Sequence, residues 1–504
     1  MAPKTAISPT REENYPEWYQ QVIRASELAE NAPVRGCMVI RPWGYGIWER
    51  IQKELDFRIK ETGHENAYFP LFIPLRFMEK EAEHVSGFAK ECAVVTHHRL
   101  IEKDGKLVPD GELEEPMIVR PTSETIIGES FRKWIESYRD LPLLINQWAN
   151  VVRWEMRPRL FLRTAEFLWQ EGHTVHETEQ EARDEVRQML GVYQDLARNV
   201  LAFGTIVGEK TQGERFPGAV QTLTLEAMMQ DRKALQAGTS HYLGQSFARA
   251  AEITFLNREG ELQTPHTTSW GVSTRMIGAL IMVHSDDDGL RLPPRVAPKH
   301  AVILPVITGD DTKASVLEYA KQIKDRLREV RFDEERVVVH LDDRDLRGGE
   351  KSWQWIKKGI PLRIEVGPRD VKEGKVVLYR RDQGAKEKQF LTIEELAQRL
   401  PAILEEIHQS YLAQSESFLE KNTKRDISNW EDLKSYFTPK NVEQPEIHGG
   451  FVIGKWCNDP EQEKKLHEHK ITIRCLPLEQ SGTEGKCIVT GKPTSVDAVF
   501  AKTY

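Results

Sequence analysis

The chain of 504 residues has few cysteines, and their number is odd. The thiols of Cys37, Cys92, Cys457, Cys475 and Cys487 cannot all pair within the chain, which argues against the disulfide framework of a secreted protein. No apolar run approaches the roughly 20 residues that a membrane-spanning helix needs. Residues 1–20 lack the apolar centre of a signal peptide. From these absences we expect a protein of the cytosol that does not enter a membrane.

An excess of positive charge is also missing. The formal net charge is −8, so overall composition gives no argument for a nucleic-acid partner, and any surface for one must be local. With 39% hydrophobic and 29% charged residues, the composition is that of an ordinary globular protein. The length allows roughly two to four domains, each with a core of its own.

What the chain does have is a concentration of charged and aromatic residues in Asn146–Glu177. This segment predicts two antiparallel strands, Gln147–Met156 and Phe161–Glu171, joined by a loop that contains Pro158. Because side chains alternate along a strand, one face of this hairpin carries Arg153, Glu155, Arg163, Phe167, Trp169 and Glu171. Guanidiniums, carboxylates and rings on one face are typical of a floor that holds a nucleotide. A hairpin with a few paired charges is the plain alternative.

Hydrophobic periodicity divides the rest of the first half into elements. Helices are predicted over Asn14–Glu30, Tyr45–Thr62, Thr125–Tyr138, Glu177–Leu201, Gln221–Gln236 and Met276–His284. Strands are predicted over Val34–Pro42, Glu65–Pro74 and Met117–Arg120. The polar segment Lys103–Glu115, which contains Gly105 and Gly111, predicts a surface loop.

Three further segments place polar groups where a site would need them. Thr122-Ser123-Glu124 puts hydroxyls and a carboxylate at the start of a helix, although a helix cap alone explains this pattern. Ala237–Gln245 combines two glycines with small polar residues and resembles a site loop, but its His241 also suits a core. Arg275 enters an apolar helix and needs an anionic partner, which is either a phosphate or a structural carboxylate.

The pattern changes beyond residues 292–295, which read LPPR, to the alternating strands and helices of a small α/β domain. Strands are predicted over Ala301–Ile307, Arg336–Leu341, Leu362–Val366 and Lys375–Tyr379, and helices over Thr312–Val330, Gly349–Lys358 and Ile393–Tyr411. Between Trp353 and Lys388, ten lysines and arginines stand against five acids. This run is either a solvated face or a contact for a phosphate backbone.

Five motifs occur in order and together resemble one family. They are RPTSE at Arg120–Glu124, FLWQEGH at Phe167–His173, GTSHYLG at Gly238–Gly244, Thr274-Arg275, and GIPLRIEVGPRD at Gly359–Asp370. The chain is similar over nearly its whole length to the prolyl-tRNA synthetases of archaeal/eukaryotic type, which are class II aminoacyl-tRNA synthetases. The resemblance implies an α+β catalytic domain with an antiparallel sheet (1–295), an α/β anticodon-binding domain (296–410) and a small α+β C-terminal domain (411–504).

The resemblance also implies roles for individual residues. The ATP site would comprise Arg153, Glu155, Arg163, Thr164, Phe167, Gln236, Thr239, Ser273 and Arg275. The proline site would comprise Phe88, Thr122, Glu124, Arg153, Trp169, His173 and His241. Arg153 and Arg275 would be the catalytic pair, with Arg153 on the α-phosphate and Arg275 stacked over the adenine opposite Phe167. Arg363 and Glu365 would contact the anticodon.

The implied activity is that of a proline–tRNA ligase. Proline and ATP give prolyl-adenylate and pyrophosphate, and the prolyl group then passes to the 3′ end of tRNA(Pro). The in-line attack needs fixed guanidiniums and Mg²⁺ rather than a side-chain nucleophile. The family is homodimeric through a first motif that matches Gly44–Pro74 here.

Two rival functions are consistent with the same fold. A synthetase-like paralogue would only bind tRNA or another protein, and such a paralogue should have lost phosphate or ammonium ligands. Glu124, Arg153 and Arg275 are all present, which favours the enzyme. A class II synthetase for another amino acid is the second rival, and Thr122, Glu124 and His241 together favour proline.

Several departures from the family pattern carry expectations of their own. Only Thr174–Gly271 separates the second and third motifs, so we expect no inserted editing domain and expect cysteine, which is close to proline in size, as the main error. Ala165 stands where many relatives have arginine, which lowers the positive charge near the nucleotide. The resemblance places Tyr504 close to the active site.

The C-terminal domain of the family often carries a four-cysteine zinc site. Here Cys457 and Cys487 remain, while Gln462 and Thr490 occupy the other two positions. Two thiolates cannot close a tetrahedral structural site, and His467 and His469 have the wrong spacing to replace the missing ligands, so we expect no zinc there.

Overall fold

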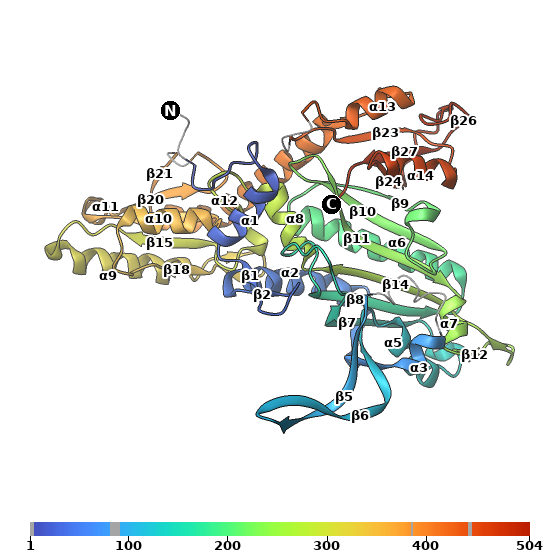
Figure 1. The fold of residues 1–504 in the computed structure, drawn as a ribbon. Helices are drawn as coiled ribbons and strands as arrows, with labels where there is room; N and C mark the ends of the chain where they lie inside the picture. Colours follow the sequence, from blue (N-terminus) through green and yellow to red (C-terminus); the bar gives the residue numbers. More distant parts are fainter. Residues whose placement is uncertain (1–4, 81–90, 385–386, 442–445) are drawn as a thin grey trace.

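An eleven-stranded sheet forms the centre of the molecule (Figure 1). The computed structural model describes residues 5–80, 91–384, 387–441 and 446–504. The strands of this sheet are β3 (Glu65–Asn66), β7 (Leu143–Val152), β8 (Glu166–His176), β9 (Thr205–Glu209), β10 (Gln221–Met228), β11 (Ala234–Gly244), β14 (His266–Ser273), β22 (Thr423–Lys424), β23 (Phe451–Lys455), β24 (Thr472–Pro477) and β27 (Asp497–Ala501). They lie in the order β22-β23-β27-β24-β9-β10-β11-β14-β8-β7-β3.

Neighbouring strands in this sheet are antiparallel, except for the pairs β3–β7 and β22–β23 at its two ends. The helices α1 (Tyr15–Ala25), α2 (Pro42–Glu61), α6 (Glu179–Asp195) and α8 (Arg275–His284) contribute to the main core. Of these, α6 lies across β8, β10, β11 and β14 and buries an apolar stripe that includes Val186, Met189 and Tyr193. A capping box between Thr178 and Glu181 fixes its start.

The predicted helix over Gln221–Gln236 is wrong. The structure has β10, a turn in which Arg232 has a φ of +63°, and the start of β11. Leu223 and Leu225 alternate with threonines as in a strand, but nearly all of β10 is buried because the sheet is covered on both faces. This burial obscures the period-two pattern. Ala237–Gln245 is likewise not a loop, because Ala237–Gly244 belongs to β11.

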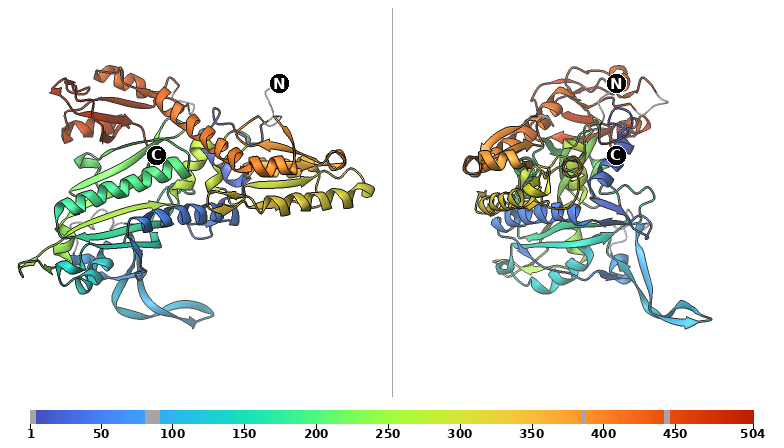
Figure 2. Two further views of the ribbon diagram at one scale, coloured as in Figure 1. Left: turned by 180° about the vertical axis from the view of Figure 1, so that it is seen from behind. Right: turned by 90° about the vertical axis from the view of Figure 1, so that its left-hand side faces the viewer.

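The predicted surface loop at Lys103–Glu115 is also wrong. It lies in a long hairpin of β5 (Ala93–Lys103) and β6 (Lys106–Val119), which turns at Asp104-Gly105, where both residues have positive φ. Figures 1 and 2 show this hairpin standing out from the body of the molecule. It has water on both sides, so its polar sequence lacks the apolar alternation by which strands are usually recognised. At its base, β6 pairs with β4 (Phe72–Pro74), which precedes α3 (Leu75–Lys80).

The central hairpin exists, but its strands are displaced from the predicted ranges. The first strand ends at Val152 and the second begins at Glu166, so the connection is longer than four residues. Within it, Phe161 has a φ of +63° and is buried, and Tyr19 donates a hydrogen bond to the carbonyl of Leu160 at 2.8 Å. Contacts with a helix distant in the sequence therefore hold this connection outside the sheet.

The α/β region contains a five-stranded sheet in the order β18-β15-β19-β20-β21. Its elements are β15 (Ala301–Pro305), α9 (Asp310–Leu327), β18 (Val339–Leu341), α10 (Gly348–Lys357), β19 (Leu362–Val366), α11 (Pro368–Glu373), β20 (Lys375–Arg380), β21 (Gln389–Thr392) and α12 (Ile393–Lys421). In Figure 2, α12 runs from this region to the C-terminal region. It therefore crosses the predicted boundary between 410 and 411, and the domain limits stay predictions.

The C-terminal region continues the central sheet. It includes α13 (Trp430–Phe437) and α14 (Pro460–Glu468), and β24 pairs with β9 through Leu476 and Glu209. The remaining short elements are β1 (Ala29–Asn31), β2 (Met38–Ile40), α5 (Glu124–Trp134), α7 (Ser246–Ala250), β12 (Phe255–Leu256), β13 (Leu262–Gln263), β16 (Arg331–Phe332), β17 (Glu335–Arg336), β25 (Gly485–Lys486) and β26 (Pro493–Thr494). Among the described residues, no helix has the length and apolar character that crossing a membrane requires.

Candidate active site

A cavity of about 240 Å³ opens over β8, β11 and β14. It brings together most of the residues that were predicted to form the two substrate sites. Those that line it are Thr122, Glu124, Arg153, Phe167, Trp169, His173, Gln236, Thr239, His241, Ser273 and Arg275. Segments more than 150 positions apart in the sequence thus meet at one place, because the central sheet sets them side by side.

Alternation along β8 accounts for one wall of the cavity. Phe167, Trp169, Glu171 and His173 occupy every second position and all line the cavity. On the neighbouring strand β14, Ser273, Gly271 and Ser269 stand opposite the last three of these.

On β11, Gln236 and Thr239 are an odd number of positions apart, yet both line the cavity. The pairing of β10 with β11 passes from Leu225–Gly238 to Glu226–Gln236 and leaves Ala237 without a partner in the ladder. This β-bulge reverses the alternation and turns both side chains to the same face.

One end of the cavity is rich in carboxylates. Thr122 donates a short hydrogen bond to Glu124, and Ser123 donates one to Glu171. The Nε2 of His173 donates to Glu171 at 3.0 Å. Burial opposes charge on both members of this pair, but their mutual attraction outweighs it, so the pKa of Glu171 is lowered and that of His173 is raised. This end of the cavity suits a cationic group.

The other end of the cavity holds the guanidinium of Arg275, and Arg153 lies between it and the carboxylates of Glu124 and Glu171. The Nε of Arg153 donates to the carbonyl of Pro121 at 2.8 Å, and its guanidinium lies 5.7 Å from the ring centre of Phe167 and 5.6 Å from that of Trp169. Burial, with the charges of Arg163 and Arg153 nearby, lowers the pKa of Arg275 to about 10. Arg275 forms no ion pair with any carboxylate of the described residues, and its Nε donates to the Leu162 carbonyl at 3.3 Å. This end therefore favours an anion.

His241 is both buried and at the cavity, so both interpretations of this residue apply. Its Nδ1 lies 3.0 Å from Thr222 Oγ1, and its ring packs on Phe216 with the ring centres 4.7 Å apart. Burial, and then the charge of His173, lowers the pKa of His241 to about 3. The imidazole is therefore neutral near pH 7.

Three predicted ATP-site residues lie outside the cavity. Glu155 accepts a hydrogen bond from the N–H of Arg157 at 2.8 Å. Thr164 is buried and donates to the carbonyl of Glu166 at 2.7 Å, and Arg163 is exposed and donates to Tyr504. Phe88, predicted for the proline site, falls outside the described residues.

The two predicted anticodon residues lie on β19, in the α/β region. Arg363 is only 6% exposed, donates to Ser352 through a short hydrogen bond and packs over the ring of Tyr379 at 4.9 Å. Glu365 is half-buried, with an oxygen 4.0 Å from Arg363. Little of the guanidinium is thus open to solvent.

Residues that sequence reasoning missed form the opposite wall of the cavity. Glu214, Arg215 and Phe216 come from the connection between β9 and β10, and Thr222 comes from β10 itself. The sequence there has no motif, and the wrong prediction of a helix over Gln221–Gln236 gave no indication of a site. Glu171 was placed on the right face but received no role.

Cys457, Cys487 and Thr490, which belong to the incomplete four-cysteine pattern, lie close together in the C-terminal region. Thr490 Oγ1 donates to Cys457 Sγ at 3.6 Å, and contact with Cys487 contributes to a raised pKa of Cys457, behind the effect of burial. Threonine thus occupies a position next to the thiols where a zinc site would need a further ligand. The expectation that no zinc binds there stays a prediction.

Comparison with known proteins gives consistent results. The sequence matches family models for the class II core domain of the tRNA synthetases (G, H, P, S and T) over residues 107–284, an anticodon binding domain over 300–403, and the C-terminal domain of prolyl-tRNA synthetase over 442–504. It is 64% identical over 501 residues to the proline–tRNA ligase of Protochlamydia amoebophila, with 99% of each chain covered. It is 56% identical to that of Paramagnetospirillum magneticum, with 100% of this chain and 99% of the relative covered.

A solved structure is similar over the same extent. The prolyl-tRNA synthetase from Cryptosporidium parvum, crystallised with halofuginone and AMPPNP, is 36% identical, covers 99% of both chains and superposes with a TM-score of 0.89. The fold class predicted from the motifs, with its antiparallel catalytic sheet, α/β anticodon-binding part and α+β C-terminal part, is confirmed. The chain belongs to the prolyl-tRNA synthetase family of class II aminoacyl-tRNA synthetases, the proline–tRNA ligases.

Proposed function

We propose that the cavity over β8, β11 and β14 is where the chain activates proline with ATP. The observation that supports this most directly is the separation of charge within it, with the carboxylates of Glu124 and Glu171 at one end and the guanidinium of Arg275 at the other. Arg153 lies between them. An amino acid held with its ammonium at the first end presents its carboxylate to Arg153, next to a nucleotide phosphate at the second end.

The proline end assigns a role to each predicted residue. The secondary ammonium of proline has two N–H donors, and Glu124 with Thr122 supplies acceptors for them. Trp169, His173 and His241 enclose the proline ring. Trp169 and His173 form two walls, and the neutral imidazole of His241 places no charge beside the apolar ring. Phe88 completes this pocket in the proposal.

The nucleotide end uses the remaining residues. The adenine lies between Phe167 and Arg275, and Arg153 holds the α-phosphate. Arg163 reaches the outer phosphates from the rim. The other proposed ATP contacts are Glu155, Thr164, Gln236, Thr239 and Ser273. Mg²⁺, which prefers oxygen ligands and keeps several waters, binds chiefly through the phosphates and supplies further charge neutralisation.

The chemistry then follows from position and charge. The proline carboxylate attacks the α-phosphorus in line, pyrophosphate leaves, and negative charge grows on the phosphate oxygens beside Arg153. Fixed guanidiniums that face this charge stabilise the transition state more than the ground state. No side chain has to act as a nucleophile. The adenylate is then consumed by the terminal ribose of tRNA(Pro).

The other partners are proposed from separate features. The basic α/β region reads the anticodon, with Arg363 and Glu365 as the proposed contacts. A second copy of the chain covers the surface around α2, where Phe57, Tyr68 and Phe72 are exposed although apolar. Thr174–Gly271 is described throughout and forms α6 and parts of the central sheet. In the proposal, discrimination against alanine rests on the cavity or on a separate factor, and cysteine is the main error. The cytoplasm, where tRNA is charged, is the proposed compartment.

The test is amino-acid-dependent exchange between ATP and pyrophosphate without tRNA, comparing proline, cysteine and alanine. We expect exchange to be fastest with proline, measurable with cysteine and weakest with alanine, because a pocket gains only about 1–3 kcal/mol per methylene. No exchange with any of them, in a folded dimer, would support the binding paralogue instead.

A further inference from the structure

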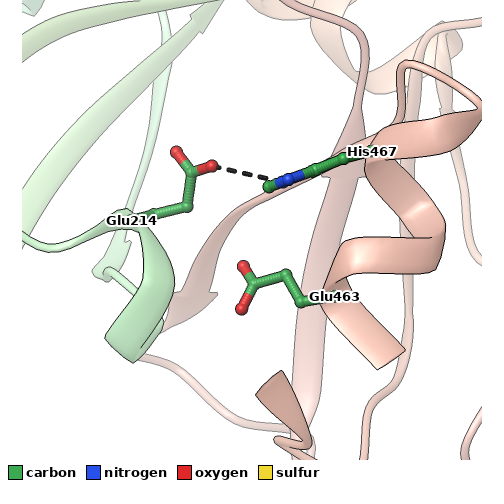
Figure 3. A group of neighbouring side chains, drawn as sticks. All are labelled: Glu214, Glu463 and His467. Carbon is green, nitrogen blue, oxygen red and sulfur yellow. Dashed lines mark ion pairs between the residues drawn. The ribbon is translucent and has the colours of Figure 1, made fainter. Parts of the chain in front are cut away.

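Glu214, Glu463 and His467 converge at the junction between the C-terminal region and the wall of the active-site cavity. Figure 3 shows their two carboxylates and imidazole pointing toward one another. We propose that these three side chains bind a divalent transition-metal ion, for which Zn²⁺ is the best match. The site is separate from Cys457 and Cys487, whose thiolates take no part in it.

The geometry of the cluster is close to that of a metal site. One ligand atom from each residue lies within 4.8 Å of the others. His467 Nε2 and Glu214 Oε1 are 3.5 Å apart. Two ligands on a zinc tetrahedron with bonds of about 2.1 Å are separated by about 3.4 Å, so this pair fits as it stands. Glu463 needs only a small side-chain rotation to become the third ligand.

The sequence supplies two of the ligands in a fixed arrangement. Glu463 and His467 are four positions apart on α14 and therefore project from the same face of the helix. Asp459 caps this helix by accepting a hydrogen bond from the N–H of Glu461 at 3.1 Å. The third ligand, Glu214, comes from a short 3₁₀ turn, Gln212–Glu214, of the catalytic region. A metal here would join two parts of the chain.

Charge gives an independent reason to expect a cation. Glu463 is only 5% exposed, and its carboxylate accepts a hydrogen bond from Thr211 Oγ1 at 2.6 Å. Within the described ranges it has no ion pair. A buried carboxylate without a cationic partner is costly, and a bound metal ion would remove that cost.

The basic residues nearest to the cluster serve a different carboxylate. Lys210 Nζ lies 2.7 Å and Arg474 Nε 2.9 Å from the oxygens of Glu226, which is fully buried. Arg474 reaches Glu214 only at 3.9 Å. The three carboxylates of Glu214, Glu226 and Glu463 thus share the two cations Lys210 and Arg474. One negative charge is left over, and a proton or a metal ion has to neutralise it.

The donor set indicates the class of metal. Two carboxylates and one imidazole suit Zn²⁺ and neighbouring first-row ions, whereas Mg²⁺ and Ca²⁺ prefer oxygen ligands alone. His467 has a side chain that is 46% exposed, which leaves a path for the ion and space for a water as the fourth ligand.

The metal site would affect proline activation by fixing the position of one wall of the active-site cavity. Arg215 and Phe216 directly follow Glu214 and line the cavity, where Phe216 packs on His241. A metal that fixes Glu214 to α14 would hold this wall in place. We therefore expect that loss of the metal raises the KM for proline severalfold and changes kcat little.

The experiment measures metal binding directly, so its result does not depend on the proposed function. The full chain is freed of metal with a chelator and titrated with Zn²⁺ by calorimetry and with Co²⁺ by absorption spectroscopy. The variants are Glu463→Gln and His467→Ala, and the controls are His469→Ala, on the same exposed end of α14, and Cys457→Ser. Far-ultraviolet circular dichroism establishes that each variant folds.

We expect one Zn²⁺ per chain, at least tenfold weaker binding in both variants and unchanged binding in both controls. Bound Co²⁺ should show no thiolate charge-transfer band, because no sulfur ligand is present. Binding that survives His467→Ala, or is lost in Cys457→Ser together with a thiolate band, would place the metal at the cysteines and overturn the proposal. Absence of binding at micromolar Zn²⁺ would also overturn it.

Discussion

Arg163 Nη2 donates a hydrogen bond of 3.0 Å to the main-chain oxygen of Tyr504, across 341 positions of sequence. The tyrosine is held from other directions as well, because its hydroxyl donates a short hydrogen bond to Asp231 and its ring lies under Lys233. The connection between β7 and β8, which carries Arg163, is thus tied to the last residue of the chain. The proposed role of Arg163 in phosphate binding requires that this hydrogen bond hold its side chain at the rim of the cavity.

This contact predicts that Arg163 and Tyr504 act together on ATP. Arg163→Ala should raise the KM for ATP about tenfold, which corresponds to about 1.4 kcal/mol. Tyr504→Phe, which keeps the main-chain oxygen and removes only the bond to Asp231, should have a smaller effect. Both are measured by ATP–pyrophosphate exchange at saturating proline. Equal KM values for ATP in the Arg163→Ala variant and the parent chain would remove the proposed role.

Arg153 lies where negative charge is expected to grow. We expect Arg153→Ala to lower the rate of adenylate formation by about 10²–10³-fold, the loss typical when one fixed donor to a transition state is removed. The matched control is Arg157→Ala, an exposed arginine in the same connection that does not line the cavity. Near-normal exchange by a folded Arg153→Ala variant would contradict the assignment.

Glu226 joins the catalytic and C-terminal regions through its contacts with Lys210 and Arg474. Glu226→Gln should lower the free energy of unfolding by about 3–5 kcal/mol, because it leaves two buried cations short of a counter-charge. Urea unfolding followed by fluorescence measures the change. The exposed Glu484→Gln serves as the control and should stay within about 0.5 kcal/mol of the parent chain.

His284 predicts a component of acid instability. Burial lowers its pKa to about 3, while its Nε2 donates to the carbonyl of Leu201 at 2.8 Å. Below about pH 6.5 the unfolded chain takes up a proton that the folded chain refuses, so stability falls as the pH drops from 6.5 toward 3. Between about pH 6 and about pH 5 this one residue should remove about 1 kcal/mol.

The measurement is the free energy of unfolding at those two pH values in the parent chain and in His284→Gln. The variant should lose about 1 kcal/mol less on acidification, whatever its stability at neutral pH. His98→Gln, at an exposed position, should leave the pH dependence unchanged. An identical pH dependence in all three proteins would show that the folded chain protonates His284 as readily as the unfolded chain does, which would contradict the prediction.

Arg363 tests whether recognition of tRNA is separate from activation. Arg363→Ala should weaken tRNA charging by about tenfold and spare ATP–pyrophosphate exchange, since β19 belongs to the α/β region. Because this side chain is buried, thermal unfolding has to be measured in parallel, with the exposed Arg369→Ala as the control. A parallel loss of charging and exchange would argue against a separate anticodon-binding unit.

The sequence by itself determined the parts that depend on local pattern. Helix α2 was recognised because its apolar residues follow the helical period, and β19 was predicted with its observed limits. Alternation placed Phe167, Trp169 and Glu171 of β8 on the face that lines the cavity, but it also placed Arg163 there, which lies outside both the strand and the cavity. The five ordered motifs were sufficient for the family.

Only the tertiary structure decided the parts in which distant segments meet. Strand β10 was wrongly predicted as part of a helix because burial of both of its faces obscures the period-two pattern, and the bulge at Ala237 shows itself only in the pairing with β10. The wall formed by Glu214 and Phe216, the bond from Arg163 to Tyr504, and the meeting of Glu214 with His467 all join residues with no local relationship. Such contacts depend on the stacking order of the strands, which short-range periodicity does not encode.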